Sequence, residues 1–327
     1  METVIATGLL LAGIAALYFG AEWLVRGSVA LALRLGIPPV IVGLTVVAFG
    51  TSSPELLVSF NAGRMGNADI AIGNVIGSNI ANVLLILGVS SLVRPIVLNI
   101  RSIRLDILFM LAVSGLLTLT VLDRDLERSD GLLFLAGMAL YMVYKVRQAM
   151  RKMREGRPDV LASGVEEIEE KARTLPRRRS ILLVVLGIAV LVGGSELFIR
   201  GAVVFARMLG VSNVVIGLTV VAFGTSLPEL ATSVLAAAKG EGDVSLGNVV
   251  GSNIFNILFI LGATAAAFPI GTGDLNLVDL LVMLGASILI IPVSLIGGRV
   301  TRPEAAVLLG LYGGYVYYLY TMHAAGL

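Results

Sequence analysis

Two stretches of this chain are nearly identical to each other. Residues 43–55 read GLTVVAFGTSSPE and residues 217–229 read GLTVVAFGTSLPE, so twelve of thirteen positions match at an offset of 174 residues. A second motif repeats at the same offset, because Gly73–Asn79 (GNVIGSN) falls on Gly247–Asn253 (GNVVGSN). Repeats of this length indicate a duplicated architecture. We expect the offset to hold without a gap from the first helix of each half to the fifth.

The composition predicts that both halves lie in a lipid bilayer. Hydrophobic residues make up 57% of the 327 positions and charged residues only 14%, with a mean hydropathy of +0.95. A soluble protein carries roughly 25% charged residues, so a soluble fold is excluded.

The residue types that are missing exclude several classes of function. The chain has no cysteine and one histidine, His323. Disulfide frameworks, thiolate or imidazole metal sites and Ser/His/Asp triads are therefore excluded. The net charge of +2 gives no uniformly basic face for a nucleic acid. We expect a membrane protein that is not an enzyme and that has no prosthetic group and no obligate protein partner.

Hydrophobic patterning predicts an all-α integral membrane protein with ten transmembrane helices. A spanning helix needs about 20 mostly apolar residues. The chain breaks at its charged and Pro/Gly-rich joints into the ranges 3–25, 38–60, 70–93, 103–122, 130–147, 180–199, 212–237, 244–268, 276–297 and 303–322. The halves 1–147 and 180–327 flank a polar stretch, 148–179, that we interpret as a solvated, partly helical linker.

Five helices in each half is an odd number, so the second half must enter the membrane from the opposite side. The chain is therefore predicted to form two inverted five-helix repeats, as in secondary transporters whose site lies near the membrane midplane. One set of loops carries 19 lysine and arginine residues and the other carries 5. Because basic residues favour the cytoplasmic side, we expect an inner (cytoplasmic) membrane protein with both termini outside and the 148–179 linker in the cytoplasm.

Each copy of the first motif places a glutamate in the middle of a predicted membrane helix. An unpaired carboxylate there costs at least about 2.5 kcal/mol, so Glu55 and Glu229 need a compensating cation. Two alternatives stay open, a protonated carboxyl or a carboxylate that faces a wet cavity. Pro54 and Pro228 lack an N–H and should kink each helix just before its glutamate. The kinks free carbonyl oxygens around Ala48, Gly50, Thr51, Ala222, Gly224 and Thr225.

Hydroxyl and amide groups cluster beside the two acids. They belong to Thr51, Ser52, Thr225 and Ser226 in the first motif and to Ser78, Asn82, Ser252 and Asn256 in the second. Ser52 is spaced i,i+3 from Glu55, which places both on one helix face. Two roles stay open for Asn79 and Asn253, as ligands or as hydrogen bonds between helices. Oxygen donors of this kind suit Ca²⁺ and Na⁺, and Mg²⁺ less well.

Charge balance at such a site predicts exchange. Two ionised glutamates are neutralised by one Ca²⁺ or by monovalent ions. One shared set of ligands cannot hold both loads without repulsion, so competition for the same pair of acids couples the two fluxes.

At these residues the chain resembles the cation/Ca²⁺ exchanger superfamily, and specifically the prokaryotic Na⁺/Ca²⁺ exchangers. The resemblance covers nearly the whole chain and rests on the paired alpha-repeat motifs GTSSPE/GNVIGSNIAN and GTSLPE/GNVVGSNIFN. It implies a secondary active antiporter that exchanges Na⁺ for Ca²⁺ by alternating access at one shared midplane site. It also implies that the first and sixth helices slide past a core of the other eight.

The resemblance assigns a role to each candidate site residue. Glu55 and Glu229 would ligate Ca²⁺ together with the carbonyl oxygens of Thr51 and Thr225. The implied flanking Na⁺ sites draw on Ser52, Ser78, Ser226, Ser252 and the carbonyl oxygens of Ala48 and Ala222.

Asn82 and Asn256 depart from many members of that superfamily, which carry an aspartate at one of these places. The site then has two formal negative charges, which argues against K⁺ co-transport, a trait of relatives with such an aspartate. An H⁺/Ca²⁺, or broader cation/H⁺, antiporter of the same architecture stays open as the alternative. Two i,i+4 pairs near the ends of the first and sixth helices are expected to form interfacial ion pairs, Glu22/Arg26 and Glu196/Arg200.

Overall fold

The computed structural model describes residues 2–35, 41, 43–97, 100–121, 125–154, 175–208, 222–272 and 275–324. Within these ranges the helices follow the order that the sequence predicts. Most of the expected linker, residues 155–174, and the start of the expected seventh helix, residues 212–221, lie outside the described residues.

The first half contains α1 (Glu2–Leu35), the π-helical turn η1 (Gly43–Val47), α3 (Ala48–Thr51), α4 (Ser53–Arg64), α5 (Ala68–Ala81), the π-helical turn η2 (Asn82–Ile86), α6 (Leu87–Val93), β1 (Ile96–Val97), α7 (Ile100–Thr120), β2 (Asp125–Leu126) and α8 (Arg128–Arg154). The second half contains α10 (Arg177–Met208), α12 (Ala222–Thr225), α13 (Leu227–Ala238), α14 (Gly242–Phe255), the π-helical turn η5 (Asn256–Leu261), α15 (Gly262–Ala267), β3 (Ile270–Gly271), α16 (Leu277–Gly297), β4 (Arg299–Val300) and α17 (Arg302–Ala324). Helices that follow one another directly, such as α5, η2 and α6, count as one segment. Each half then contains five described segments.

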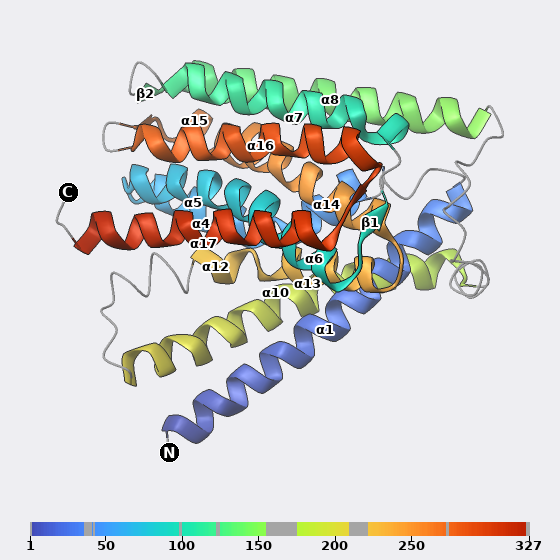
Figure 1. Cartoon of the computed structure of the whole chain (residues 1–327), viewed down its shortest axis with the longest axis horizontal. Helices are drawn as coiled ribbons and strands as arrows, with labels where there is room; N and C mark the ends of the chain where they lie inside the picture. The colour runs from blue at the N-terminus through green and yellow to red at the C-terminus, as the bar shows by residue number, and fades with distance from the viewer. Residues whose placement is uncertain are drawn as a thin grey trace.

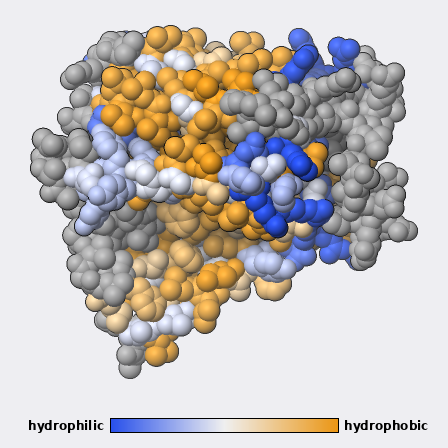
Figure 2. All heavy atoms as spheres, in the orientation of Figure 1, coloured by the Kyte–Doolittle hydropathy of each residue, from blue (hydrophilic) through white to orange (hydrophobic). Residues whose placement is uncertain are grey.

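Apolar helices of membrane-spanning length make up most of the structure. Within the described ranges, six helices are long and apolar enough to cross a membrane, or seven if the bent pair α3/α4 counts as one span. Large hydrophobic side chains such as Leu11, Leu140 and Tyr317 are more than 60% exposed. Hydrophobic residues cover much of the face in Figure 2, while hydrophilic residues gather toward the end where β1 pairs with β4. The chain is therefore a multi-pass membrane protein.

α1 and α10 are longer than the sequence predicts. We expected helices over 3–25 and 180–199, whereas α1 has 34 residues and ends at Leu35, and α10 has 32 residues and ends at Met208. Charged residues such as Arg26 do not end these helices, because long basic side chains extend to polar surroundings. At 1.5 Å per residue, α1 is about 51 Å long and exceeds the roughly 30 Å of the bilayer core. Figure 1 shows both helices running obliquely to the others.

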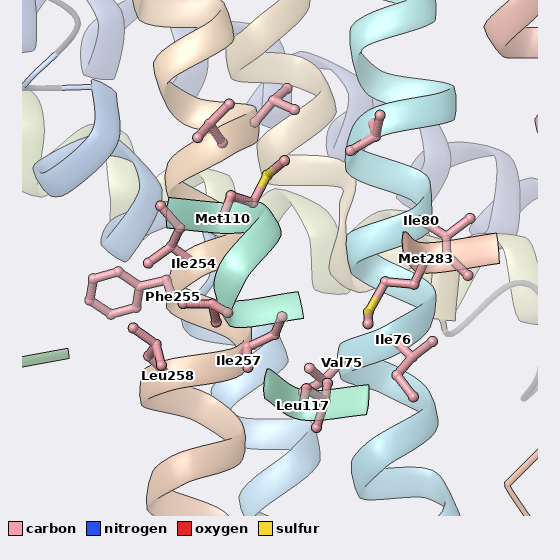
Figure 3. Packing of buried hydrophobic residues seen from close by; sticks show 14 of the residues in the cluster. Val75, Ile76, Ile80, Met110, Leu117, Ile254, Phe255, Ile257, Leu258 and Met283 are labelled. Carbon is pink, nitrogen blue, oxygen red and sulfur yellow. The ribbon is translucent and has the colours of Figure 1, made fainter. Parts of the chain in front are cut away.

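The hydrophobic packing divides the molecule into two parts. The larger buried cluster contains residues of all the described segments except α1 and α10. Figure 3 shows its centre, where side chains of α5, α7, α14, η5 and α16 meet around Met110 and Met283. A second buried cluster joins α1 and α10 to α13 and includes Leu24, Leu191 and Leu227. The structure thus contains a core of eight segments and a separate pair, α1 and α10.

Glycines spaced seven residues apart hold this pair together. They are Gly13, Gly20 and Gly27 on α1 and Gly187, Gly194 and Gly201 on α10. A Cβ added at Gly20 would lie 2.8 Å from the backbone nitrogen of Leu191, and one added at Gly187 would lie 2.6 Å from that of Leu24. The two helices therefore run antiparallel with their backbones in contact, as small residues allow in membranes.

A pseudo-twofold axis relates the two halves. β1 of the first half pairs with β4 of the second, and β2 pairs with β3, so the two short ribbons are equivalent under the 174-residue offset. The prediction of an all-α protein did not include these two short ribbons. Equivalent residues that touch each other must lie on the axis, and Asn79 and Asn253 do so through reciprocal hydrogen bonds.

The expectation of a gapless offset is wrong in the fourth segment of each half. The hydroxyl oxygens of Ser114 on α7 and Ser287 on α16 meet at 3.4 Å on the axis, an offset of 173. Tyr141 and Tyr315 keep the offset of 174, while the aspartates that accept from their hydroxyls, Asp106 and Asp279, differ by 173. Equivalent residues of α7 and α16 are therefore 173 rather than 174 positions apart, and they still meet on the axis.

Candidate ion-binding site

Both glutamates lie directly after a break in their helix. α3 ends at Thr51 and α4 begins at Ser53, with a bend of 53° between the η1–α3 helix and α4. Pro54 stands at the start of α4, where a missing N–H is tolerated and the preceding helix cannot continue. In the second half, Pro228 occupies the same place in α13. The predicted kinks are confirmed.

At the helix break in the second half, one backbone carbonyl accepts a hydrogen bond from a residue that the sequence did not single out. Pro228 has no N–H to donate to Gly224, four residues before it. The hydroxyl of Ser195 on α10 donates to the Gly224 carbonyl at 2.5 Å instead. The equivalent of Ser195 in the first half is Ala21, which has no hydroxyl, so this contact does not repeat.

Each glutamate accepts a hydrogen bond from a serine of the opposite half. Ser52 donates to Oε1 of Glu229 at 2.8 Å, and Ser226 donates to Oε1 of Glu55 at 3.1 Å. The hydrogen bond of each serine goes to the glutamate of the opposite half, a partner that the i,i+3 spacing within one helix did not predict. Ser226 also lies 3.3 Å from the hydroxyl of Ser78. The four motifs therefore converge on one place between the repeats.

Four carboxylate and amide oxygen atoms of the two motifs are buried and have no hydrogen-bond donor among the residues that the structure describes. They are Oε2 of Glu55, Oε2 of Glu229, Oδ1 of Asn82 and Oδ1 of Asn256. All four side chains are about 1% exposed. A buried carboxylate oxygen without a donor is costly and needs a compensating partner. Two carboxylates and two amide oxygens are ligands that hard cations prefer.

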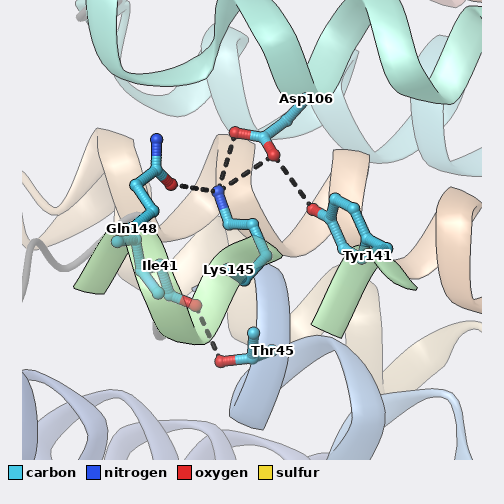
Figure 4. Close-up of polar contacts among 6 residues, drawn as sticks. All are labelled: Ile41, Thr45, Asp106, Tyr141, Lys145 and Gln148. Carbon is cyan, nitrogen blue, oxygen red and sulfur yellow. Dashed lines mark hydrogen bonds and ion pairs between the residues drawn. The ribbon is translucent and has the colours of Figure 1, made fainter. Parts of the chain in front are cut away.

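Neither carboxylate is paired with a basic side chain in the described part of the chain. Lys145, which is also buried, is bound elsewhere. Its ammonium group donates to both oxygens of Asp106, at 2.9 and 3.0 Å, and to Gln148, while Tyr141 donates to the same aspartate (Figure 4). Lys145 therefore neutralises Asp106 and not the two glutamates.

The amides of the second motif form a closed network on the axis. Asn82 donates through Nδ2 to Oδ1 of Asn253 at 2.9 Å, and Asn256 donates through Nδ2 to Oδ1 of Asn79 at 3.0 Å. Asn79 and Asn253 thus bond each other and two neighbouring amides. Of the two roles left open for them, the structure shows hydrogen bonding between helices. The π-helical turns η2 and η5 begin at Asn82 and Asn256, and such turns are frequent at functional sites.

Sequence reasoning missed a second pair of asparagines, Asn74 and Asn248. Thr51 donates to Oδ1 of Asn248 at 3.2 Å, and Asn248 donates to Ser233 at 2.9 Å and to the Glu229 carbonyl at 3.4 Å. The other half repeats the pattern with Thr225, Asn74, Ser59 and the Glu55 carbonyl. Both asparagines stand in the repeated GNV tripeptide, which was the available signal.

The remaining candidate residues lie at the same place in different roles. The Thr51 hydroxyl is also within 3.1 Å of its own i−4 carbonyl, that of Val47. The Ala48 carbonyl accepts from the N–H of Ser52 at 3.0 Å. Ser252 is buried, and its hydroxyl has no partner among the described residues. Ala222 begins α12, one turn before the second helix break.

The repeat and the site match one family of proteins. A family model described as "Sodium/calcium exchanger protein" matches residues 5–147 and 179–321. The chain is 38% identical over 323 residues to the "Putative antiporter CaxA" of Alkalimonas amylolytica, covering 97% of this chain and 99% of that protein. It is 35% identical to "Inner membrane protein YrbG" of Escherichia coli (strain K12), covering 97% and 96%.

The solved structures agree with these relatives. The fold superimposes with a TM-score of 0.82 on a structure of the sodium-calcium exchanger NCX_Mj soaked with Na⁺ and Ca²⁺, at 31% identity and with coverage of 96% of this chain and 98% of the other. The expected architecture of ten helices in two inverted repeats is thereby confirmed, and the proteins of this kind are transporters rather than enzymes. The chain belongs to the sodium/calcium exchanger family of membrane proteins.

Proposed function

We propose that this protein is a secondary active antiporter that exchanges Na⁺ for Ca²⁺ at one site between Glu55 and Glu229. The observation that carries the proposal is the set of four buried oxygens without donors, contributed equally by the two halves. Two carboxylates supply the charge that one Ca²⁺ balances, and the amide oxygens of Asn82 and Asn256 extend the coordination shell. Ca²⁺ takes six to eight oxygen ligands, and the nearby hydroxyls and carbonyls supply the rest.

Exchange follows from the sharing of one pair of acids. A bound Ca²⁺ neutralises both carboxylates, so Na⁺ and Ca²⁺ cannot occupy the full ligand set together. Ser52, Ser78, Ser226 and Ser252, with the carbonyls of Ala48 and Ala222, are the proposed Na⁺ ligands beside the acids, and the carbonyls of Thr51 and Thr225 complete the Ca²⁺ site. The similar protein NCX_Mj is described as a sodium-calcium exchanger, which supports Na⁺ as the counter-ion.

The contacts of α1 and α10 with the core support alternating access. The core follows the twofold axis, but the pair does not. Glu22 on α1 is bonded to Lys239 at the end of α13 at 3.0 Å, and not to Arg26 as we expected. Its equivalent, Glu196 on α10, pairs with Arg200 of its own helix. Two equivalent halves can also adopt the exchanged arrangement, in which α10 rather than α1 leans on the core, and the site then opens to the other side.

Transport by purified protein in liposomes tests the proposal. Liposomes loaded with Na⁺ and diluted into choline medium should take up ⁴⁵Ca²⁺, and an ionophore that collapses the Na⁺ gradient should abolish the uptake. Liposomes loaded with K⁺, and liposomes with an imposed pH gradient, are the matched controls. Uptake that follows the pH gradient and ignores Na⁺ would overturn Na⁺ coupling and assign the H⁺/Ca²⁺ alternative. Flux that needs no counter-ion would identify a channel.

We propose further that the protein lies in the inner membrane with both termini outside and the 148–179 linker in the cytoplasm. The loop charges support this placement, and so does the Escherichia coli relative, which is named an inner membrane protein. The chain has no cysteine, so single cysteines report on sidedness without background labelling. In intact cells a membrane-impermeant maleimide should label Met65→Cys and should not label Val97→Cys, two positions that are 71% and 59% exposed. The reverse pattern would overturn the orientation.

A further inference from the structure

The two asparagines on the axis have an orientation that cannot be reversed. Asn79 donates through Nδ2 to the backbone carbonyl of Asn253 at 3.4 Å, and Asn253 donates through Nδ2 to the backbone carbonyl of Asn79 at 3.3 Å. A backbone carbonyl only accepts hydrogen bonds, so each Nδ2 must face the opposite backbone. Each Oδ1 therefore points away from that carbonyl. Both side chains are about 1% exposed, so the protein groups around them set their orientation.

Asn253 and Asn79 in turn fix the orientation of one amide each in the opposite half. Oδ1 of Asn253 accepts from Asn82, and Oδ1 of Asn79 accepts from Asn256. If the Asn82 amide were flipped, its oxygen would lie where its nitrogen now lies, 2.9 Å from another acceptor oxygen. Two acceptors at that distance repel, so only one amide orientation satisfies the network. That orientation turns Oδ1 of Asn82 and Oδ1 of Asn256 away from the axis pair and leaves both without donors.

We propose that Asn79 and Asn253 are positioning residues, each of which holds the amide oxygen of the opposite half's ligand, Asn82 or Asn256, toward the transported cation. The proposal rests on the function proposed above. Without its positioning residue an amide rotates, and its NH₂ group then faces the cation for part of the time. The partial positive charge of that group opposes cation binding. Asn79 and Asn253 thus act on affinity through other residues and do not themselves touch the ion.

A purely structural role would give a different result, because bonds that only join helices affect unfolding and not the ion. The crosswise pairing separates the two roles. Asn253 should matter for Ca²⁺ binding only while Asn82 is present, and Asn79 only while Asn256 is present. A positioning residue and a ligand whose side chains do not bond each other, such as Asn79 and Asn82, act independently through their side chains and supply the matched control.

The test measures Ca²⁺ binding at equilibrium, from the rise in unfolding temperature of purified protein as Ca²⁺ is titrated. Asn253→Ala should weaken Ca²⁺ binding roughly tenfold, the scale of one hydrogen-bond-like contact to a charged group. Adding Asn253→Ala to Asn82→Ala should weaken it no further. Adding Asn79→Ala to Asn82→Ala should multiply the two single effects, because Asn79 holds the other ligand.

A conservative variant guards against loss of folding. Asn253→Ser keeps a hydroxyl oxygen as an acceptor for Nδ2 of Asn82 and adds no charge, so it should weaken Ca²⁺ binding less than Asn253→Ala. Weakening as large as that of the alanine variant would overturn the proposal. So would multiplied effects in the Asn82/Asn253 pair, or an Asn253→Ala protein with a lower unfolding temperature and unchanged Ca²⁺ affinity. Absence of Ca²⁺ binding in the unsubstituted protein would overturn the proposed function together with this inference, whereas normal binding with an independent pair would overturn this inference alone.

Discussion

Glutamine in place of one site glutamate separates the charge of the site from its shape. Glu55→Gln keeps the side-chain size and an oxygen that can accept from Ser226, and it removes one of the two formal charges. One bound Ca²⁺ then leaves a positive charge without a counter-charge inside the membrane, which costs at least about 2.5 kcal/mol. At about 1.4 kcal/mol for each factor of ten, the affinity for Ca²⁺ should fall at least roughly 60-fold.

The same substitution should have the opposite effect on the ion-free protein. Glu55 and Glu229 are neighbouring acids in one buried place, and removing one of them relieves repulsion between like charges. The unfolding temperature without Ca²⁺ should therefore not fall, while the same rise in unfolding temperature should need at least roughly 60-fold more Ca²⁺. Both quantities can be read from thermal unfolding followed by the fluorescence of the single tryptophan, Trp23, with ⁴⁵Ca²⁺ uptake measured on the same preparations.

Glu196→Gln is the matched control for this experiment. The chemical change is identical, but Glu196 lies on the exposed side of α10, with 56% of its side chain accessible. Its Ca²⁺ affinity should equal that of the unsubstituted protein. If Glu55→Gln binds Ca²⁺ within threefold of the unsubstituted protein, the charge argument is refuted.

Three further substitutions test the packing around the site by thermal unfolding in detergent. Gly20→Ala places a Cβ 2.8 Å from the backbone of α10 and should lower the free energy of unfolding by about 1–3 kcal/mol, whereas Gly8→Ala has open space and should not. Lys145→Met removes the ammonium group that neutralises the buried Asp106 and should cost about 3–5 kcal/mol, part of which Asp106→Asn should restore in the double variant. Ser195→Ala removes the donor from the carbonyl at the second helix break and should cost about 1–3 kcal/mol. An unchanged unfolding temperature in any of the destabilising variants contradicts the contact in question.

The repeat and the residue types were sufficient to predict the fold class and the helix breaks. Glu55 and Glu229 follow prolines in an apolar context, and both facts are local in the sequence. The family comparisons confirm the inverted architecture that the odd number of helices implies. The identity of the site ligands stays a prediction, supported by the convergence of both motifs.

What sequence reasoning did not provide are the relations between the halves. Local spacing pairs Ser52 with Glu55, but the fold pairs Ser52 with Glu229, since the helix breaks turn each hydroxyl across the axis. Asn74 bonds a threonine of the other half, and no pattern within one helix predicts such a partner. The one-residue shift of Ser114 against Ser287 is likewise visible only from their contact. Contacts between distant segments depend on how the helices assemble, which spacing along one chain does not encode.

Direct backbone contact between α1 and α10 makes these two helices a single packed unit. The glycines bring the two backbones together, buried side chains such as Leu24 and Leu191 pack beside them, and each helix is contributed by a different half of the chain. In the alternating access proposed above, a displacement of this pair at one face of the membrane also displaces it at the other face. The pair would then not open both faces at once, and this coupling would protect the ion gradients from leakage.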